Sequence, residues 1–433
     1  MISAKIGFRN LARNRWRSGL TLGGIAVSVA FMVWILGFME GWMGEMVRGA
    51  TAVETGQVQV HTVAFAESPR AHRSFSLDSA MLDTIRSVDG VEAVTPRVRF
   101  YGLVGHEEKS QVAQIVGVDP TLEAEATPVA EGMREGRWLA DTIPEYPAPR
   151  EAVLGEGVAR QLRVGTGDKL VAFFEAADGS LGNDLLEVVG IVRTGNSVVD
   201  RNTVYLHLED TQFLGALTGE VHELAIRTAD MTRAREVGEA VAEAIDARTE
   251  APDDVEEAPD EVKNALLVRP WQEILPSLSQ MLAISKESYF FTYLLIYLVA
   301  AVGILNTQRM SALERKREFG VLMAIGMRPR KMFRMIVTES LVLGTLGGIL
   351  GTILGVAVTW YHSVAGLDLG LFTDKGGFTW MGVSFTGKIH AILTPMIIFQ
   401  PVVVMVAVAF LAGLWPAVKS ARIDPAPTIA GRT

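Results

Sequence analysis

Residues 20–43 read LTLGGIAVSVAFMVWILGFMEGWM, an apolar run long enough for one helix to cross a bilayer core of roughly 30 Å. Three more apolar runs of similar length follow at residues 288–308, 335–360 and 396–416. About 240 residues of ordinary soluble composition separate the first run from the second. This spacing predicts an α-helical membrane protein with four transmembrane helices and a large mixed α/β domain, residues 44–287, inserted between the first and second helices.

Charge is distributed unevenly along the chain and predicts its orientation. Residues 1–19, 309–334 and 417–433 are basic, whereas residues 44–287 carry 22 basic against 42 acidic residues. Short basic segments stay in the cytoplasm, so we expect both termini and the 309–334 loop inside, and the α/β domain and the 361–395 loop outside. A nucleic-acid patch at the N-terminus is disfavoured because an apolar run follows it directly. A cleaved signal peptide is disfavoured because that run is too long and no small-residue cleavage site follows it.

The external domain shows strand and helix patterns punctuated by turn residues. An apolar stripe from Trp271 to Leu282 predicts a helix that either rises from the membrane as a stalk or lies on the domain. The acidic stretch Glu250–Glu261 predicts a solvated loop. We expect helices at Asp78–Ser87, Gly155–Leu162 and Thr232–Ala247, and strands at Val58–Ala64, Val94–Val104, Val112–Val118, Leu170–Phe174, Leu185–Val192, Thr203–Leu208 and Val221–Ile226.

Signatures of catalysis and metal binding are missing from the sequence. It has no cysteine, its seven histidines are scattered, and it contains no Walker A, Gly-x-Ser-x-Gly or His-Glu-x-x-His sequence. We therefore predict no catalytic residue, no metal site and no cofactor on this chain. Glu339 is the main charge within the apolar runs, and this scarcity argues against a proton- or sodium-driven transporter.

The third apolar run carries Gly347, Gly351 and Gly355 at four-residue spacing. Glycines on one face of a transmembrane helix allow a second helix to approach closely, so we expect a helix-packing face there. A phosphate-binding loop is disfavoured because the segment has no Gly-Lys-Ser/Thr ending and lies within an apolar run.

Residues 310–326, MSALERKREFGVLMAIG, predict a short amphipathic helix between the second and third membrane helices. Gly326 suits the end of this helix and Pro329 suits the start of the next. Apolar contacts are offered by Leu313, Val321 and Ile325. The residues leave two interpretations open: an interfacial helix resting on lipid headgroups, or a docking element for a cytoplasmic partner.

Asn306-Thr307, Glu314–Gly320 and Ala324-Ile325-Gly326 together resemble the signature of the FtsX-like ABC-transporter permeases. This family includes lipoprotein-releasing permeases, the macrolide-exporter type and the cell-division permease. Further similar segments are Arg9–Asn14, Arg17-Ser18, Leu20-Thr21, Pro416-Ala417 and Ala421–Pro425, and more weakly residues 56–60, 117–120, 136–139 and 165–168. The resemblance therefore extends over nearly the whole chain.

The resemblance implies that the loop is a coupling helix that binds in a groove on a separate ATPase subunit, which carries the ATP and Mg. ATP binding would close the ATPase pair and move two permeases with it, either two copies of this chain or this chain and a paralogue. The residues assigned to this coupling are Glu314, Arg315, Arg317, Glu318, Phe319, Gly320, Ala324 and Gly326. Because only 19 residues precede the first apolar run, we expect the ATPase to be a separate partner.

The resemblance also implies a multi-pass protein of the bacterial inner membrane with a large periplasmic domain. In this family the external domains act on a substrate that is already outside or in the outer leaflet, which is called mechanotransmission. We expect a β-rich subdomain at about residues 125–215. Aromatic residues in the 361–395 loop would either meet membrane lipid or pack on the external domain; these are Phe372, Phe378, Trp380 and Phe385.

Three functions fit this reading. The favoured one is release of lipoproteins from the inner membrane to a periplasmic carrier. The second is a signalling permease that controls a periplasmic enzyme or sensor and moves nothing. The third is efflux of drugs or peptides through an adaptor and an outer-membrane duct.

Overall fold

The computed structural model describes residues 15–143, 148–250, 252, 255, 258–368, 378–380, 383–385 and 388–423. Several predicted features lie outside these residues. They are the N-terminal motif Arg9–Asn14, Phe372, the Asp424-Pro425 end of the C-terminal motif, and much of the acidic stretch Glu250–Glu261.

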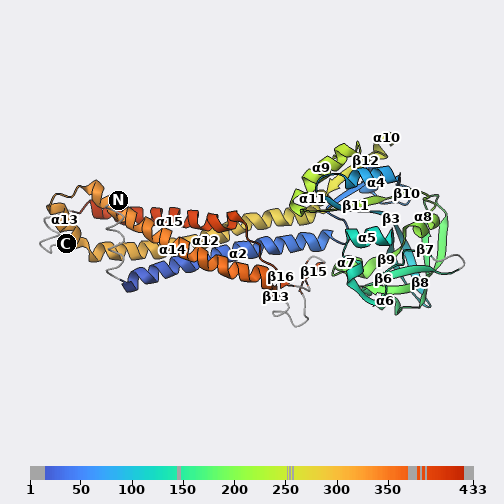
Figure 1. The fold of residues 1–433 in the computed structure, drawn as a ribbon, viewed down its shortest axis with the longest axis horizontal. Coiled ribbons are helices and arrows are strands. Elements are labelled where there is room, and N and C mark those ends of the chain that lie inside the picture. The colour runs from blue at the N-terminus through green and yellow to red at the C-terminus, as the bar shows by residue number, and fades with distance from the viewer. Residues whose placement is uncertain are drawn as a thin grey trace. The chain divides into compact units, whose positions relative to one another are not determined.

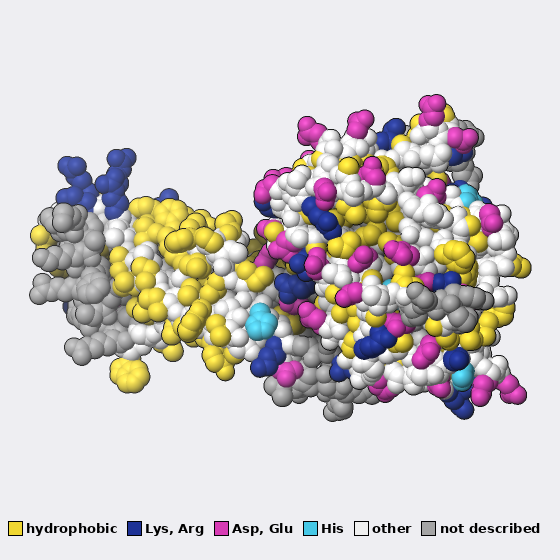
Figure 2. Space-filling model, turned by 45° about the vertical axis from the view of Figure 1, so that its right-hand side comes forward, with side chains coloured by type: hydrophobic (Ala, Val, Ile, Leu, Met, Phe, Trp, Pro, Cys, Tyr) yellow, Lys and Arg dark blue, Asp and Glu magenta, His cyan; other side chains and the backbone are white. Residues whose placement is uncertain are grey.

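The chain forms two compact units. The first, called here the helical unit, contains Met1–Gly44, Leu282–Asp368 and Lys388–Thr433. The second, called the α/β unit, contains Glu45–Met281 and Leu369–Gly387. Hydrophobic side chains cover much of the long helices, whereas acidic and basic side chains are scattered over the α/β unit (Figure 2).

Four long helices carry the apolar runs (Figure 1). Each is long and apolar enough to cross a membrane, and each predicted crossing segment lies inside one of them. The helices are α2 (Arg15–Thr51), α12 (Pro276–Glu314), α14 (Pro329–Ala365) and α15 (Pro395–Ala421). Buried side chains from all four form a shared apolar core that includes Val29, Ile304, Leu343 and Met405.

The loop between α12 and α14 differs from the prediction at its start. Residues 310–314 are the last turn of α12, and a separate helix α13 (Lys316–Ala324) begins after Arg315. The predicted single helix over 310–326 was therefore wrong at its N-terminal end. Its backbone bonding explains why: the amide of Arg315 donates to the carbonyl of Ser311 at 3.2 Å, so α12 continues past its apolar run into charged sequence.

The predicted helix from Trp271 to Leu282 is interrupted. A short helix, α11, covers only Trp271–Ile274, and a second helix, α12, begins at Pro276. A proline lacks the amide hydrogen that a helix interior needs but is accepted in the first turn, so Pro276 starts a new helix and does not continue the old one. Trp271 and Leu278 of this stripe are buried.

The α/β unit is built on one hydrogen-bonded sheet with the strand order β12-β1-β11-β3-β4-β9-β6-β8-β5. The strands are β1 (Val58–Thr62), β3 (Val91–His106), β4 (Lys109–Val118), β5 (Met133–Gly136), β6 (Arg150–Gly155), β8 (Leu181–Val192), β9 (Thr203–His207), β11 (Glu223–Thr228) and β12 (Leu266–Pro270). Strands β5, β6 and β12 have no counterpart among the predicted strands, whereas each predicted strand agrees with an observed one to within a few residues.

Part of this sheet closes on itself. Strand β7 (Lys169–Glu175) pairs with β8 along its whole length and with residues Gly102–Gly105 of β3. The pairings β3-β4-β9-β6-β8-β7-β3 thus form a ring of six strands. The predicted β-rich range 125–215 contains four of the six strands, but β3 and β4, which precede it, supply the other two.

Local capping explains where several helices of this unit begin. Asp78 accepts a hydrogen bond from the amide of Met81 at the start of α4 (Ser79–Arg86). Asp119 caps α5 (Pro120–Ala126), whose proline occupies the first turn. Helix α9 (Ala234–Ala244) buries Val237 and Val241 on the side of β1 and β12. The remaining helices include α6 (Glu156–Leu162), α7 (Ser197–Asn202) and α8 (Leu208–Leu214).

The 361–395 loop contains two short antiparallel pairs. Strand β13 (Leu367–Asp368) pairs with β16 (Lys388–Ile389), and β14 (Phe378–Trp380) pairs with β15 (Val383–Phe385).

Candidate functional site

The α12–α13 junction is held by Arg315. Its guanidinium forms an ion pair with Glu339 of α14 at 3.0 Å and a longer one with Glu318 at 3.4 Å, and it lies 5.1 Å from the centre of the Phe319 ring. Glu339, which stood out in the sequence as a charge within an apolar run, therefore has a cationic partner. The sequence predicts that Arg315 contacts the ATPase, and it gives no sign of the ion pair with Glu339. No local pattern links two residues 24 positions apart.

The predicted coupling residues divide into buried and exposed groups. Phe319 and Gly320 are buried, and Phe319 is packed with Met332, Ile336 and Ala417. Glu314, Arg317, Ala324 and Gly326 are exposed. Of the side chains predicted to make apolar contacts, Leu313 is 52% exposed, Val321 41% and Ile325 80%. Helix α13 is thus anchored through Arg315 and Phe319, and it leaves an apolar face with flanking charges open.

The end of α13 has the geometry expected for a glycine stop. Gly326 has φ of +101°, a conformation that side chains other than glycine rarely adopt. The amide of Met327 donates to the carbonyl of Leu322 at 3.0 Å, and Pro329 then begins α14.

The glycines of α14 lie against α2. A methyl group added at Gly351 would come within 2.5 Å of the Ala26 carbonyl oxygen, and one at Gly355 within 2.8 Å of the Val33 Cβ. Gly347 faces Ile25 in the same way. Because glycine has no Cβ, the two backbones approach more closely here than other side chains allow.

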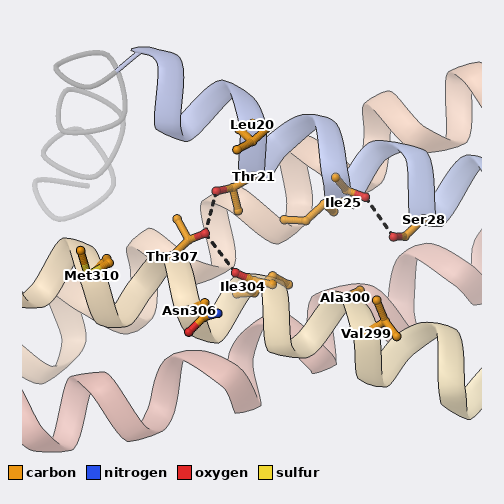
Figure 3. Close-up of a pocket in the computed structure, with 12 residues that line it drawn as sticks. Leu20, Thr21, Ile25, Ser28, Val299, Ala300, Ile304, Asn306, Thr307 and Met310 are labelled. Atoms are coloured by element: carbon orange, nitrogen blue, oxygen red, sulfur yellow. Dashed lines mark hydrogen bonds between the residues drawn. The ribbon is translucent and has the colours of Figure 1, made fainter.

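A groove of about 580 Å³ runs between α2 and α12 (Figure 3). Small or hydroxyl-bearing residues, among them Gly24, Ser28 and Gly303, line it together with larger apolar side chains. Thr21 donates to Thr307 at 3.0 Å across the two helices, and Thr307 in turn donates to the carbonyl of Gly303. The volume lies within the range of about 300–1,000 Å³ common for small-molecule sites.

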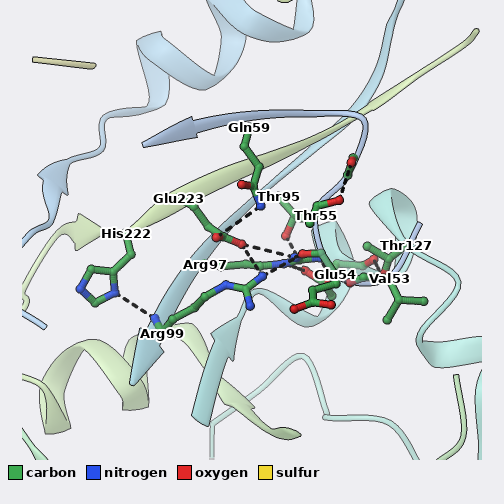
Figure 4. Close-up of polar contacts among 12 residues, drawn as sticks. Val53, Glu54, Thr55, Gln59, Thr95, Arg97, Arg99, Thr127, His222 and Glu223 are labelled. Carbon is green, nitrogen blue, oxygen red and sulfur yellow. Dashed lines mark hydrogen bonds and ion pairs between the residues drawn. The ribbon is translucent and has the colours of Figure 1, made fainter. Parts of the chain in front are cut away.

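A buried charge cluster in the α/β unit holds the residues that follow α2 (Figure 4). Arg97 is 1% exposed; its Nε and Nη2 donate to the Glu123 carboxylate at 3.0 and 2.6 Å. Its Nη1 and Nη2 also donate to the carbonyl oxygens of Glu54 and Val53 at 2.5 and 3.2 Å. The guanidinium thus ties the chain leaving α2 to strand β3.

Arg99 and Glu223 complete this cluster. Arg99 donates to Glu223 at 2.7 Å and to the Glu54 carbonyl at 2.8 Å. Burial alone would raise the pKa of Glu223, but Arg99 and Arg97 lower it overall. Burial alone would likewise lower the pKa of Arg97, and Glu123 raises it overall. Glu223 and the two arginines therefore stay charged inside the protein at neutral pH.

His61, on β1 beside this cluster, makes the stability of the unit sensitive to acid. Burial and then the positive charge of Arg269 lower its pKa from 6.5 to about 4. Above pH 6.5 the ring is neutral in both folded and unfolded chains and contributes no pH dependence. Between pH 6.5 and 4 the unfolded chain binds a proton that the folded chain does not, so we expect stability to fall by about 3 kcal/mol as the pH decreases.

Denaturant unfolding of the full chain across this pH window measures the effect. His61→Leu should flatten the curve between pH 6.5 and 4, whereas His72→Leu, at an exposed position, should leave it unchanged. Equal slopes for wild type and His61→Leu would contradict the assignment.

Comparisons with known proteins agree with this architecture. The model of the MacB-like periplasmic core domain matches residues 18–264, and that of the FtsX-like permease C-terminal domain matches residues 290–425. An uncharacterized ABC transporter permease of Methanocaldococcus jannaschii is 22% identical over 98% of this chain and 96% of its own length.

Two relatives have more specific names. The lipoprotein-releasing system transmembrane protein LolC of Neisseria meningitidis serogroup B is 23% identical over 83% of this chain and 82% of its own length. The macrolide export ATP-binding/permease protein MacB of a Shewanella species is 22% identical over 98% of this chain and 60% of its own length, so this chain corresponds to its permease part. The chain therefore belongs to the FtsX-like ABC-transporter permeases with a MacB-like periplasmic domain, multi-pass proteins of the inner membrane.

Proposed function

We propose that this chain is the permease subunit of a transporter that releases lipoproteins from the inner membrane, driven by a separate cytoplasmic ATPase. The observation that carries this proposal is the similarity to the lipoprotein-releasing LolC relative along most of both chains. The similarity to the macrolide-export relative favours efflux as the second candidate.

Helix α13 is the proposed contact for the ATPase, which would carry the ATP and Mg. Its exposed apolar side chains, Val321 and Ile325, and the exposed charge of Arg317 suit a protein groove with a polar rim. Phe319 and Arg315 would act from inside: the first packs α13 on the helical unit, and the second ties it to α14. A movement of α13 would in this way be transmitted to α14 through the Arg315–Glu339 ion pair and the packed Phe319 ring.

Helix α2 is the proposed transmitting element. It is continuous from Arg15 to Thr51, it packs closely on the glycines of α14, and the residues just after it are bound by Arg97. A stiff helix held along its middle and just past its C-terminal end can move the α/β unit without a charged pathway through the membrane. The α2–α12 groove, lined by small and by larger apolar side chains, would receive the acyl chains of a lipoprotein or the helices of a second permease copy.

Coupling is tested with the full chain and its co-purified ATPase. We expect Arg317→Glu combined with Ile325→Asp to abolish ATPase binding without changing the thermal unfolding temperature, because both side chains are exposed. The matched control Arg330→Glu alters an exposed charge at the start of α14 and should retain binding. Normal ATPase binding in the double variant would overturn the assignment of α13.

The role of the Arg315–Glu339 ion pair is tested by charge reversal in the full chain with its co-purified ATPase. Arg315→Glu should uncouple ATP hydrolysis from release, because it places two carboxylates side by side at Glu339. The double variant Arg315→Glu/Glu339→Arg restores an opposite-charge pair and should recover coupling. A double variant as defective as the single one would show that the pair is not the connection.

Substrate and partners are identified by purifying the tagged chain from its native membrane and analysing the bound proteins by mass spectrometry. An ATPase together with acylated proteins supports lipoprotein release, and a soluble periplasmic carrier strengthens it. An ATPase with a periplasmic hydrolase or sensor replaces the proposal with signalling, and an adaptor with an outer-membrane duct replaces it with efflux. Recovery of the tagged chain without any ATPase would overturn the hypothesis that it is part of an ATP-driven transporter.

A further inference from the structure

A second cavity, of about 190 Å³, lies at the cytoplasmic end of the helical unit, between the C-terminal parts of α12 and α15. It is called here the basic cleft. Its lining includes three cationic side chains, one indole and two aliphatic side chains: Arg309, Lys316, Lys419, Trp415, Leu313 and Ile423. It is distinct from the α2–α12 groove and shares no cation with the Arg315–Glu339 pair.

Within the described residues, the three cations of the basic cleft have no carboxylate partner. Arg309 and Lys419 lie 5.7 and 5.1 Å from the centre of the Trp415 ring. Within the described part of the chain, neither these two nor Lys316 forms an ion pair with a carboxylate. Three like charges around one small cavity repel one another, and the electron-rich face of an indole offsets only part of that repulsion. The cleft therefore favours an anion.

The position and the remaining lining indicate which anion. Tryptophan is enriched where helices meet the membrane surface, and the cytoplasmic leaflet carries anionic lipids that attract lysine and arginine. Leu313 is 52% exposed beside the cations, so a ligand here meets an apolar wall as well as charge. An inorganic anion would interact only with the cations, whereas a phospholipid would contact both the cations and the apolar wall.

We infer that the basic cleft binds the phosphodiester headgroup of an anionic phospholipid from the cytoplasmic leaflet. Arg309, Lys316 and Lys419 donate to the phosphate oxygens, and Leu313 and Ile423 contact the glycerol and first acyl carbons. Lys316 is the first residue of α13, so the bound lipid also holds the start of this helix. This goes beyond the proposed function and holds whatever the transporter moves.

Binding is measured on the full-length protein in detergent. It is titrated with dioctanoyl phosphatidylglycerol, dioctanoyl phosphatidylcholine and inorganic phosphate, and bound lipid is counted by native mass spectrometry. We expect saturable binding of phosphatidylglycerol and much weaker binding of the other two. The triple variant Arg309→Gln/Lys316→Gln/Lys419→Gln should bind phosphatidylglycerol about a hundredfold more weakly, from about fivefold for each cation.

Two matched variants keep the test specific. Arg328→Gln/Arg330→Gln/Lys331→Gln removes the same net charge at exposed positions just before and at the start of α14, outside the cleft, and should bind normally. Arg309→Lys/Lys316→Arg/Lys419→Arg keeps the charge in the cleft and should retain binding.

Three results would overturn the inference. If both triple glutamine variants lost phosphatidylglycerol binding equally, the binding would be a general charge attraction and not a property of the basic cleft. Displacement of phosphatidylglycerol by an equal concentration of inorganic phosphate would make the ligand a free anion. Normal lipid binding with lost ATPase binding in the cleft variant would assign the three cations to the partner protein.

Discussion

Arg97→Met is expected to lower the free energy of unfolding of the α/β unit by about 3–5 kcal/mol, because it leaves the fully buried Glu123 carboxylate without its cation. Methionine fills much of the same space, so the loss comes from charge and not from a cavity. The carbonyl groups of Val53 and Glu54 lose their donor at the same time. Urea unfolding of the full chain, with hydrogen exchange to locate the opened segments, measures both effects.

Two further variants separate the charge effect from general disturbance. Arg97→Met/Glu123→Leu removes both partners and should recover much of the lost stability, because the Glu123 charge is then no longer buried without its cation. Arg233→Met breaks the exposed pair with Glu236 and should cause no measurable change. If Arg97→Met were as stable as Arg233→Met, the cluster would not hold the unit together.

The Arg97 variant also tests the transmission proposal. Exchange should speed up first at residues 52–55, the segment whose carbonyls Arg97 and Arg99 bind. If this segment transmits force from α2, ATP hydrolysis should continue in the variant while release is lost. Loss of both activities together would instead indicate a general folding defect.

Gly351→Leu is expected to separate α14 from α2 and to lower the stability of the helical unit, at the upper end of about 1–3 kcal/mol. The first added carbon already lies 2.5 Å from the carbonyl oxygen of Ala26 and 2.7 Å from the Cβ of Val29. A backbone oxygen cannot swing aside as a flexible side chain can, so the helices must move apart. Thermal unfolding of the full chain in detergent measures the change.

Gly303→Leu is the matched control on α12. A carbon added there meets no atom within 4 Å, because Gly303 lines the open α2–α12 groove. We expect unchanged or slightly higher stability, since leucine favours a helix more than glycine does. Equal destabilisation by the two leucines would show that glycine content, and not close approach to α2, determines stability.

Patterns local in sequence predicted much of the fold. The four apolar runs, the polar insertion after the first, and Gly326 and Pro329 at the helix ends each follow from a few neighbouring residues. Alternation predicted most strands of the α/β unit. Strands β6 and β12 were missed because they are short and nearly continuously buried, so they show no polar–apolar alternation.

The loop between α12 and α14 shows which features a local sequence pattern can predict and which it cannot. Its helix, its glycine stop and its general place between α12 and α14 could be predicted from residues 310–329. Its start could not, because a helix ends where its backbone bonding stops and not where its apolar run stops. Nor could the pattern tell which residues face inward: Phe319 is buried, while Val321 and Ile325 are open.

The sequence by itself determined the number of membrane-spanning helices, the insertion of the α/β domain and the face of glycines on α14, because helical periodicity and length depend on neighbours in the chain. Only the tertiary structure decided that Arg97 meets Glu123 and Glu223, that Arg315 meets Glu339, and that β7 closes a ring with β3. These contacts join residues 24 to 126 positions apart. A charge has many possible partners along the chain, and only packing in three dimensions selects the one that burial brings within hydrogen-bonding distance.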